Sequence, residues 1–143
     1  MRLRYLLIVL ILSGCSNGFF LAPYPIDRTQ KTMRVSLGSN GLLGHLKAEL
    51  AKNGWKLLIR KKKGIKPEDK DQKQTRYHLK THTRKIGNDC LWLSPFVSSP
   101  TIKYDISITD NTTREEVFLI KDWGCGYQRT ARKIVEKIES NVR

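Results

Sequence analysis

Histidines are the side chains of this 143-residue chain best suited to binding a metal or moving protons. His78 and His82 are four positions apart in a segment that alternates polar and apolar residues, as strands do. That spacing separates them by roughly 13 Å on a strand, too far to chelate one ion unaided. His45 lies in a stretch with helical spacing, where a surface or partly buried histidine is usual. We therefore expect no catalytic residue, no metal site and no cofactor.

The first 14 residues are typical of a secretory signal peptide. Arg2 and Arg4 precede the apolar run Tyr5 to Leu12, which is too short to cross a bilayer as a helix. The four residues Leu12 to Cys15 resemble the lipobox of bacterial lipoproteins. The resemblance implies that Cys15 is acylated and becomes the first residue of the mature protein. It also implies sorting to the outer membrane, because Ser16 and not Asp follows the cysteine. The alternatives are an ordinary signal peptide with a chance cysteine, or a buried apolar segment.

Two further cysteines, Cys90 and Cys125, remain once Cys15 carries lipid. An even pair in an exported protein indicates a disulfide. Closing a loop of about 36 residues contributes roughly 3 to 4 kcal/mol in the chain-entropy picture. A metal site or a redox-active pair is the alternative, but the chain contains no C-x-x-C motif.

The charge of the chain is strongly positive. A formal charge of +14 falls to +12 when Arg2 and Arg4 leave with the signal. Such a balance favours an anionic partner: phospholipid head groups, lipopolysaccharide phosphates, glycan carboxylates or nucleic acid. Export argues against nucleic acid, so we expect none. The alternative is that the excess lysine and arginine only forms solvated surface.

Residues 15–32 contain two prolines and no sustained period, which predicts a tether between the lipid and the domain. The tether is more apolar than a free linker requires, and its apolar side chains rest either on the domain or on the membrane interface. These side chains are Phe19, Phe20, Leu21 and Tyr24. Residues 33–143 are expected to form one domain, because the mature chain is long enough for a single core.

Apolar periodicity predicts five strands and two helices in that domain. The strands are expected at 33–37, 55–59, 77–84, 102–109 and 116–121, and the helices at 42–51 and 127–142. The first helix links the first two strands as a right-handed crossover, which makes them parallel. The fold class is therefore α+β: a two-layer sandwich with a mixed, mostly antiparallel sheet of about five strands and two helices on one face.

A basic patch is the candidate binding site. It is predicted on the second and third strands and on the polar loop at 61–74, which we expect to order on binding. Its residues are Lys56, Arg60, Lys61, Lys62, Lys63, Lys66, Arg76, Lys80 and Arg84. The residues form one patch only if the second and third strands are neighbours in the sheet.

The segment Gly41 to Ile59, a helix with an Asn-Gly stop leading into a strand, is similar to the small lipoprotein plug of the outer-membrane lipopolysaccharide translocon. The chain departs from that family in its cysteine pair and its shorter strand region. The resemblance implies a noncatalytic partner of an outer-membrane machine that contacts lipopolysaccharide through basic residues.

Together these features predict a noncatalytic outer-membrane lipoprotein. Its domain faces the periplasm and serves as a binding or assembly accessory of an envelope complex, through an envelope protein, anionic lipid or lipopolysaccharide. One alternative is a lipoprotein that neutralises a periplasmic toxin or competitor. Another is a peptidoglycan- or lipid-acting enzyme that uses His78, His82 or a nearby carboxylate.

Overall fold

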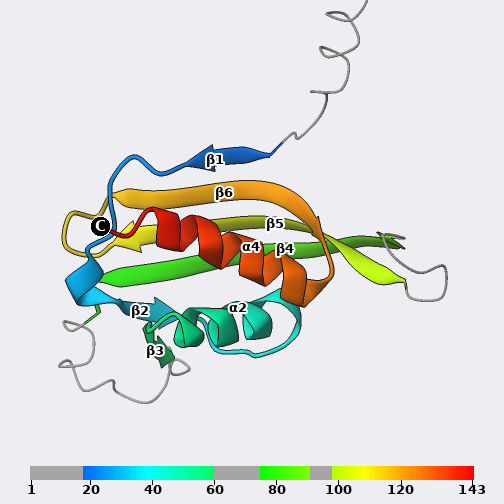
Figure 1. Cartoon of the computed structure of the whole chain (residues 1–143), viewed down its shortest axis with the longest axis horizontal. Helices are drawn as coiled ribbons and strands as arrows, with labels where there is room; N and C mark the ends of the chain where they lie inside the picture. The colour runs from blue at the N-terminus through cyan, green and yellow to red at the C-terminus, as the bar shows by residue number, and fades with distance from the viewer. Residues whose placement is uncertain (1–17, 60–74, 91–97) are drawn as a thin grey trace, which may run out of the picture.

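Segments in which apolar and polar residues alternate form a single sheet in the computed structural model, which describes residues 18–59, 75–90 and 98–143 (Figure 1). Two helices, α2 and α4, lie on one face of this sheet. The elements are β1 (Phe19–Leu21), the 3₁₀ turn η1 (Arg28–Gln30), β2 (Thr32–Val35), α2 (Gly41–Lys52), β3 (Lys56–Ile59), β4 (Tyr77–Cys90), β5 (Ser99–Asp110), β6 (Glu116–Cys125) and α4 (Tyr127–Ser140).

The strand order is β1-β6-β5-β4-β2-β3. β2 is parallel to both β3 and β4, and the other pairs are antiparallel. The α+β class, the mixed sheet and the parallel pair joined by α2 are confirmed. The order differs from the expectation in one important respect, because β2 lies between β3 and β4 and keeps them apart.

The sixth strand comes from the segment expected to be a tether. Phe20 in β1 packs edge to face on Phe118, with ring centroids 5.5 Å apart. Ile26 is fully buried, and its backbone exchanges hydrogen bonds with Asn141 and Arg143 at the C-terminus. Phe20 and Ile26 therefore pack on the domain, whereas Phe19, Leu21 and Tyr24 remain about half exposed. Residues 18–32 are part of the fold rather than a free linker.

The core lies between the sheet and the two helices. Leu42, Leu46 and Leu50 recur every fourth residue on α2, which places them on one side of the helix, where they are buried. The corresponding buried residues of α4 are Ala131, Ile134, Val135 and Ile138. A glycine with positive φ lies at one end of each helix. Gly54, with a φ of +82°, follows α2, and Gly126, with a φ of +71°, precedes α4.

A disulfide joins Cys90, at the end of β4, to Cys125, at the end of β6, with Cα atoms 5.6 Å apart. The predicted pairing is confirmed. β4 is longer than the sequence indicated, because its pairing with β5 continues past register shifts at Gly87 as far as Cys90. The bridge therefore closes the end of the sheet from which α4 departs.

Candidate functional site

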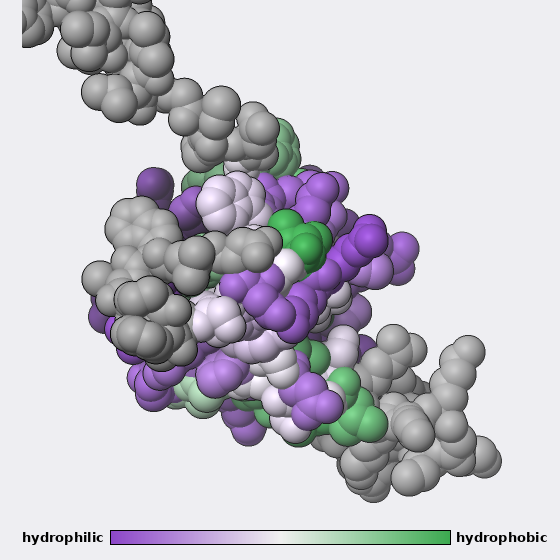
Figure 2. Space-filling view, turned by 90° about the vertical axis from the view of Figure 1, so that its right-hand side faces the viewer, coloured by the Kyte–Doolittle hydropathy of each residue, from purple (hydrophilic) through white to green (hydrophobic). Residues whose placement is uncertain are grey.

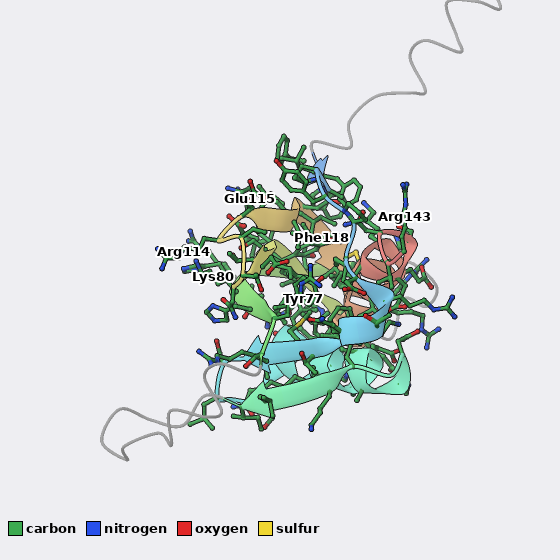
Figure 3. The ribbon with its side chains drawn as sticks, turned by 90° about the vertical axis from the view of Figure 1, so that its left-hand side faces the viewer. Tyr77, Lys80, Arg114, Glu115, Phe118 and Arg143 are labelled. Atoms are coloured by element: carbon green, nitrogen blue, oxygen red, sulfur yellow. A yellow bond between two sulfur atoms is a disulfide. The ribbon has the colours of Figure 1, made fainter. Side chains whose placement is uncertain are left out.

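The face of the sheet opposite the helices is not covered by any described helix or strand, and it carries a group of basic side chains. Strand alternation places them there, because the intervening residues, such as Leu79 and Ile106, are buried under the helices. We call this surface the basic face; its cations are Arg34, Lys56, Lys80, Arg84, Lys103 and Lys121. Figure 3 shows Lys80 on the side away from the helices, whereas Tyr77 and Phe118 point into the interior.

Two cations of the basic face are directly opposite each other. Arg84 on β4 pairs in register with Lys103 on β5, and Lys103 pairs with Trp123 on β6. Neighbouring strands are about 4.8 Å apart, so like charges in this arrangement repel each other. Neither cation forms an ion pair with any residue in the described part of the chain. An anion bound at this row would relieve the repulsion.

The next row of the basic face contains a carboxylate. His82, Asp105 and Lys121 are register partners on β4, β5 and β6. The Lys121 Nζ is 3.1 Å from the Asp105 carboxylate, and both side chains are about half exposed. This row therefore presents charged and hydrogen-bonding groups, with Asp105 paired to Lys121.

His78 and His82 share a strand face, as expected from the sequence. Among residues 18–59, 75–90 and 98–143, no group of three or more potential metal-ligating side chains is close enough to hold an ion. In the same part of the chain, no helix is both long enough and apolar enough to cross a membrane.

Arg76, a residue of the predicted patch, is engaged in internal ion pairs. Its Nε donates to Asp110 at 3.0 Å and its Nη1 to Asp27 at 2.6 Å. The hydrogen bond to Asp110 is the main reason why the pKa of Arg76 is raised. Arg76 thus links the β5–β6 turn to the start of η1, and this is a structural position.

The remaining patch residues are divided between described and undescribed parts of the chain. Lys80 and Arg84 lie on the basic face. Lys56 on β3 is opposite Thr32 on β2, so β2 separates it from the cations of β4. Arg60, Lys61, Lys62, Lys63 and Lys66 lie outside the described residues, as do Cys15 and the whole of the 61–74 loop.

Sequence reasoning missed Arg34, Lys103, Lys121 and Trp123. The signal was present for Lys103, because Lys103 and Asp105 alternate with the buried Ile102, Tyr104 and Ile106. Alternation identifies the side of a strand but not its neighbours, so the row could not be assembled without the strand order.

A hollow of about 670 Å³ lies on the helix side of the sheet, between β6 and α4. Tyr104 and Asp122 contribute to its wall, together with Lys133 and Glu136. Burial, with a smaller contribution from the Asp122 charge, raises the pKa of Tyr104 to about 12. The phenol therefore remains protonated at neutral pH.

Seen from the end at which the disulfide lies, the surface of the molecule is mostly hydrophilic with small apolar patches (Figure 2).

No protein-family model matches the chain, and no curated protein matches it. Solved structures do resemble it. A leucine-to-methionine variant of the PelC dodecamer from Paraburkholderia phytofirmans has a TM-score of 0.54 at 15% identity and covers 90% of this chain and 100% of that one. A second PelC dodecamer structure from the same organism has a TM-score of 0.52 at 17% identity, covering 89% and 99%. At this identity the likeness shows a shared fold.

Proposed function

We propose that this protein is a noncatalytic, lipid-anchored accessory of the bacterial cell envelope whose basic face binds an anionic component there. Cys15 carries the lipid, and the domain projects from the outer membrane into the periplasm. The lipobox-like segment supports the anchor, and the Cys90–Cys125 disulfide suits an oxidising compartment.

The observation that carries the binding proposal is the unpaired row of Arg84 and Lys103. Two like-charged side chains that are register partners on neighbouring strands, whose backbones are about 4.8 Å apart, cost stability unless a counter-charge joins them. An open sheet face also exposes a broad surface, so it suits an extended or polymeric anion rather than a small molecule enclosed in a pocket.

In-cell photocrosslinking tests this proposal. A photoreactive side chain in place of His82, an exposed residue of the basic face, should give discrete adducts with an envelope component. The same side chain in place of Arg132, an exposed residue of α4, is the control. Equal adducts from both positions, or none from His82, would contradict binding at the basic face.

We further propose that the chain assembles with copies of itself, because both PelC structures that share its fold are dodecamers. Light scattering on the detergent-solubilised, lipidated protein measures the mass of the assembly. A mass of many subunits is expected, and a stable monomer at micromolar concentration would remove this part of the proposal.

A further inference from the structure

The exposed apolar side chains are concentrated at one edge of the sheet. Eight large apolar residues are exposed in the described chain, and five of them lie in β1, shortly after it, or on the neighbouring β6. These five are Phe19, Phe20, Leu21, Tyr24 and Trp123, each between 45% and 53% exposed. In a chain that is otherwise strongly charged, such a cluster indicates a contact surface.

The edge is held rigidly by the sheet. Phe19 pairs with Lys121 and Leu21 with Leu119 on β6, so both side chains share the open face with Trp123. Phe20 points to the other side, where its ring packs on Phe118. Apolar side chains therefore extend from both faces of the same edge, and we call this cluster of five residues the apolar edge.

The position of the apolar edge along the chain limits what can cover it. Phe19 is four residues after Cys15, and four residues span at most about 14 Å. If Cys15 carries acyl chains in the bilayer, β1 cannot lie further than this from the lipid surface. Because β1 is held in the sheet by β6, the whole edge is brought to the membrane with it.

The side chains around the apolar edge match a lipid interface. Aromatic rings with a polar atom, such as Trp123 and Tyr24, favour the head-group region, where one end of the ring is apolar and the other wet. Lys137 lies over the Phe20 ring, with its Nζ 5.2 Å from the centroid, and Lys121 is next to Phe19. Long lysine side chains in such positions extend to phosphates while their stems cover apolar surface.

We infer that the apolar edge docks on the phospholipid surface to which Cys15 is anchored, so that the sheet stands on its β1 edge. This inference rests on the lipid anchor of the proposed function. β3 is then the distal edge, five strand spacings or about 24 Å from β1. The basic face stands upright above the membrane and remains accessible from the periplasm.

Fluorescence quenching in vesicles tests this orientation. The lipidated full chain is reconstituted into vesicles of phosphatidylethanolamine and phosphatidylglycerol with brominated acyl chains. Tryptophan emission should be quenched in the wild type, and the quenched part should disappear in Trp123→Phe. In the Trp123→Phe background, Ile59→Trp introduces an exposed indole on the distal β3, which should stay unquenched.

Removing the apolar side chains tests the docking itself. The double variant Phe19→Ser/Leu21→Ser should lose most of the quenching of Trp123. Ile86→Ser is the matched control, since Ile86 is an equally exposed apolar residue on β4. Circular dichroism establishes that each variant is folded, and a single Phe19→Ser substitution serves if the double variant is not.

Vesicle flotation separates the two claims. A chain that floats but shows no Trp123-dependent quenching is anchored without docking, which overturns the inference and leaves the lipid anchor standing. A chain that does not float overturns the anchor and the inference with it. If a second copy of the chain covers the apolar edge instead, the protein floats, Trp123 is shielded from brominated lipid, and the inference is again overturned.

Discussion

Arg84 and Lys103 are directly opposite each other on β4 and β5, on the open face of the sheet, and neither has an ion-pair partner in the described chain. The chain thus keeps an unfavourable like-charge pair where solvent and partners reach it. The first prediction concerns the cost of this pair.

Lys103→Gln should increase the free energy of unfolding by about 0.5 kcal/mol, because it removes the repulsion from Arg84. Denaturant titration at low ionic strength measures the gain, which should fade as added salt screens the charges. Lys121→Gln is the matched control. It breaks the ion pair with Asp105 and should give no gain. If both variants lose stability equally, the repulsion between Arg84 and Lys103 is negligible.

Arg76→Gln should lower the free energy of unfolding by about 2 kcal/mol, because it leaves the buried Asp110 carboxylate without its cation. The equivalent change on the basic face, Arg84→Gln, should cause no loss and should instead increase the free energy of unfolding by about 0.5 kcal/mol, because it removes the repulsion from Lys103. Thermal and denaturant unfolding compare the two. A similar loss in both variants would contradict the distinction between a structural and a surface arginine.

The dependence of the free energy of unfolding on pH in the acid range should report the ion pairs of Arg76 with Asp27 and Asp110. Hydrogen bonds from Thr29, together with Arg76, lower the pKa of Asp27. Burial raises the pKa of Asp110, but hydrogen bonds from the Thr112 backbone and from Arg76 outweigh it and lower the value overall. Since both values are below the ordinary 3.8, the stabilisation is complete above pH 3.8 and is lost as the pH falls through the folded-state values.

The stability difference between wild type and Arg76→Gln should therefore be constant near neutral pH and shrink below pH 3.8. Urea unfolding at a series of pH values measures it. A difference that stays the same in strong acid would mean that Arg76 stabilises the fold by packing and not through the two carboxylates.

Reducing the disulfide should cost about 3 to 4 kcal/mol, because the bridge between Cys90 and Cys125 spans a separation of 35 residues. The double variant Cys90→Ser/Cys125→Ser should match the reduced wild type in a chemical unfolding experiment. Equal stability of the oxidised and reduced proteins would show that the bridge does not constrain the unfolded chain.

Much of the fold follows from local patterns in the sequence. The leucines of α2 and the isoleucines of β5 have periods of helix and strand, and Asn53-Gly54 ends α2 where the sequence indicates. The cysteine pairing follows because only two cysteines remain after Cys15.

Features that depend on long-range pairing could not be predicted in this way. β1 has only three residues, and its stability comes from β6 and from the contact of Phe20 with Phe118. Nothing local indicates that β2 inserts between β3 and β4, and this order decides which cations share a face. Arg76 shows the same limit, because its two carboxylate partners are 34 and 49 positions away.

Binding of a soluble polyanion at the basic face tests the central claim most directly. We would measure the salt concentration that elutes the protein from immobilised heparin for the wild type, for Arg84→Gln/Lys103→Gln and for Arg132→Gln/Lys133→Gln on α4. The two double variants lose the same net charge. Our account predicts that Arg84→Gln/Lys103→Gln elutes at a clearly lower salt concentration than the wild type. Arg132→Gln/Lys133→Gln should elute at almost the same salt concentration as the wild type. Equal decreases in both would show that net charge alone attracts the polyanion, and would contradict a binding site on the open face of the sheet.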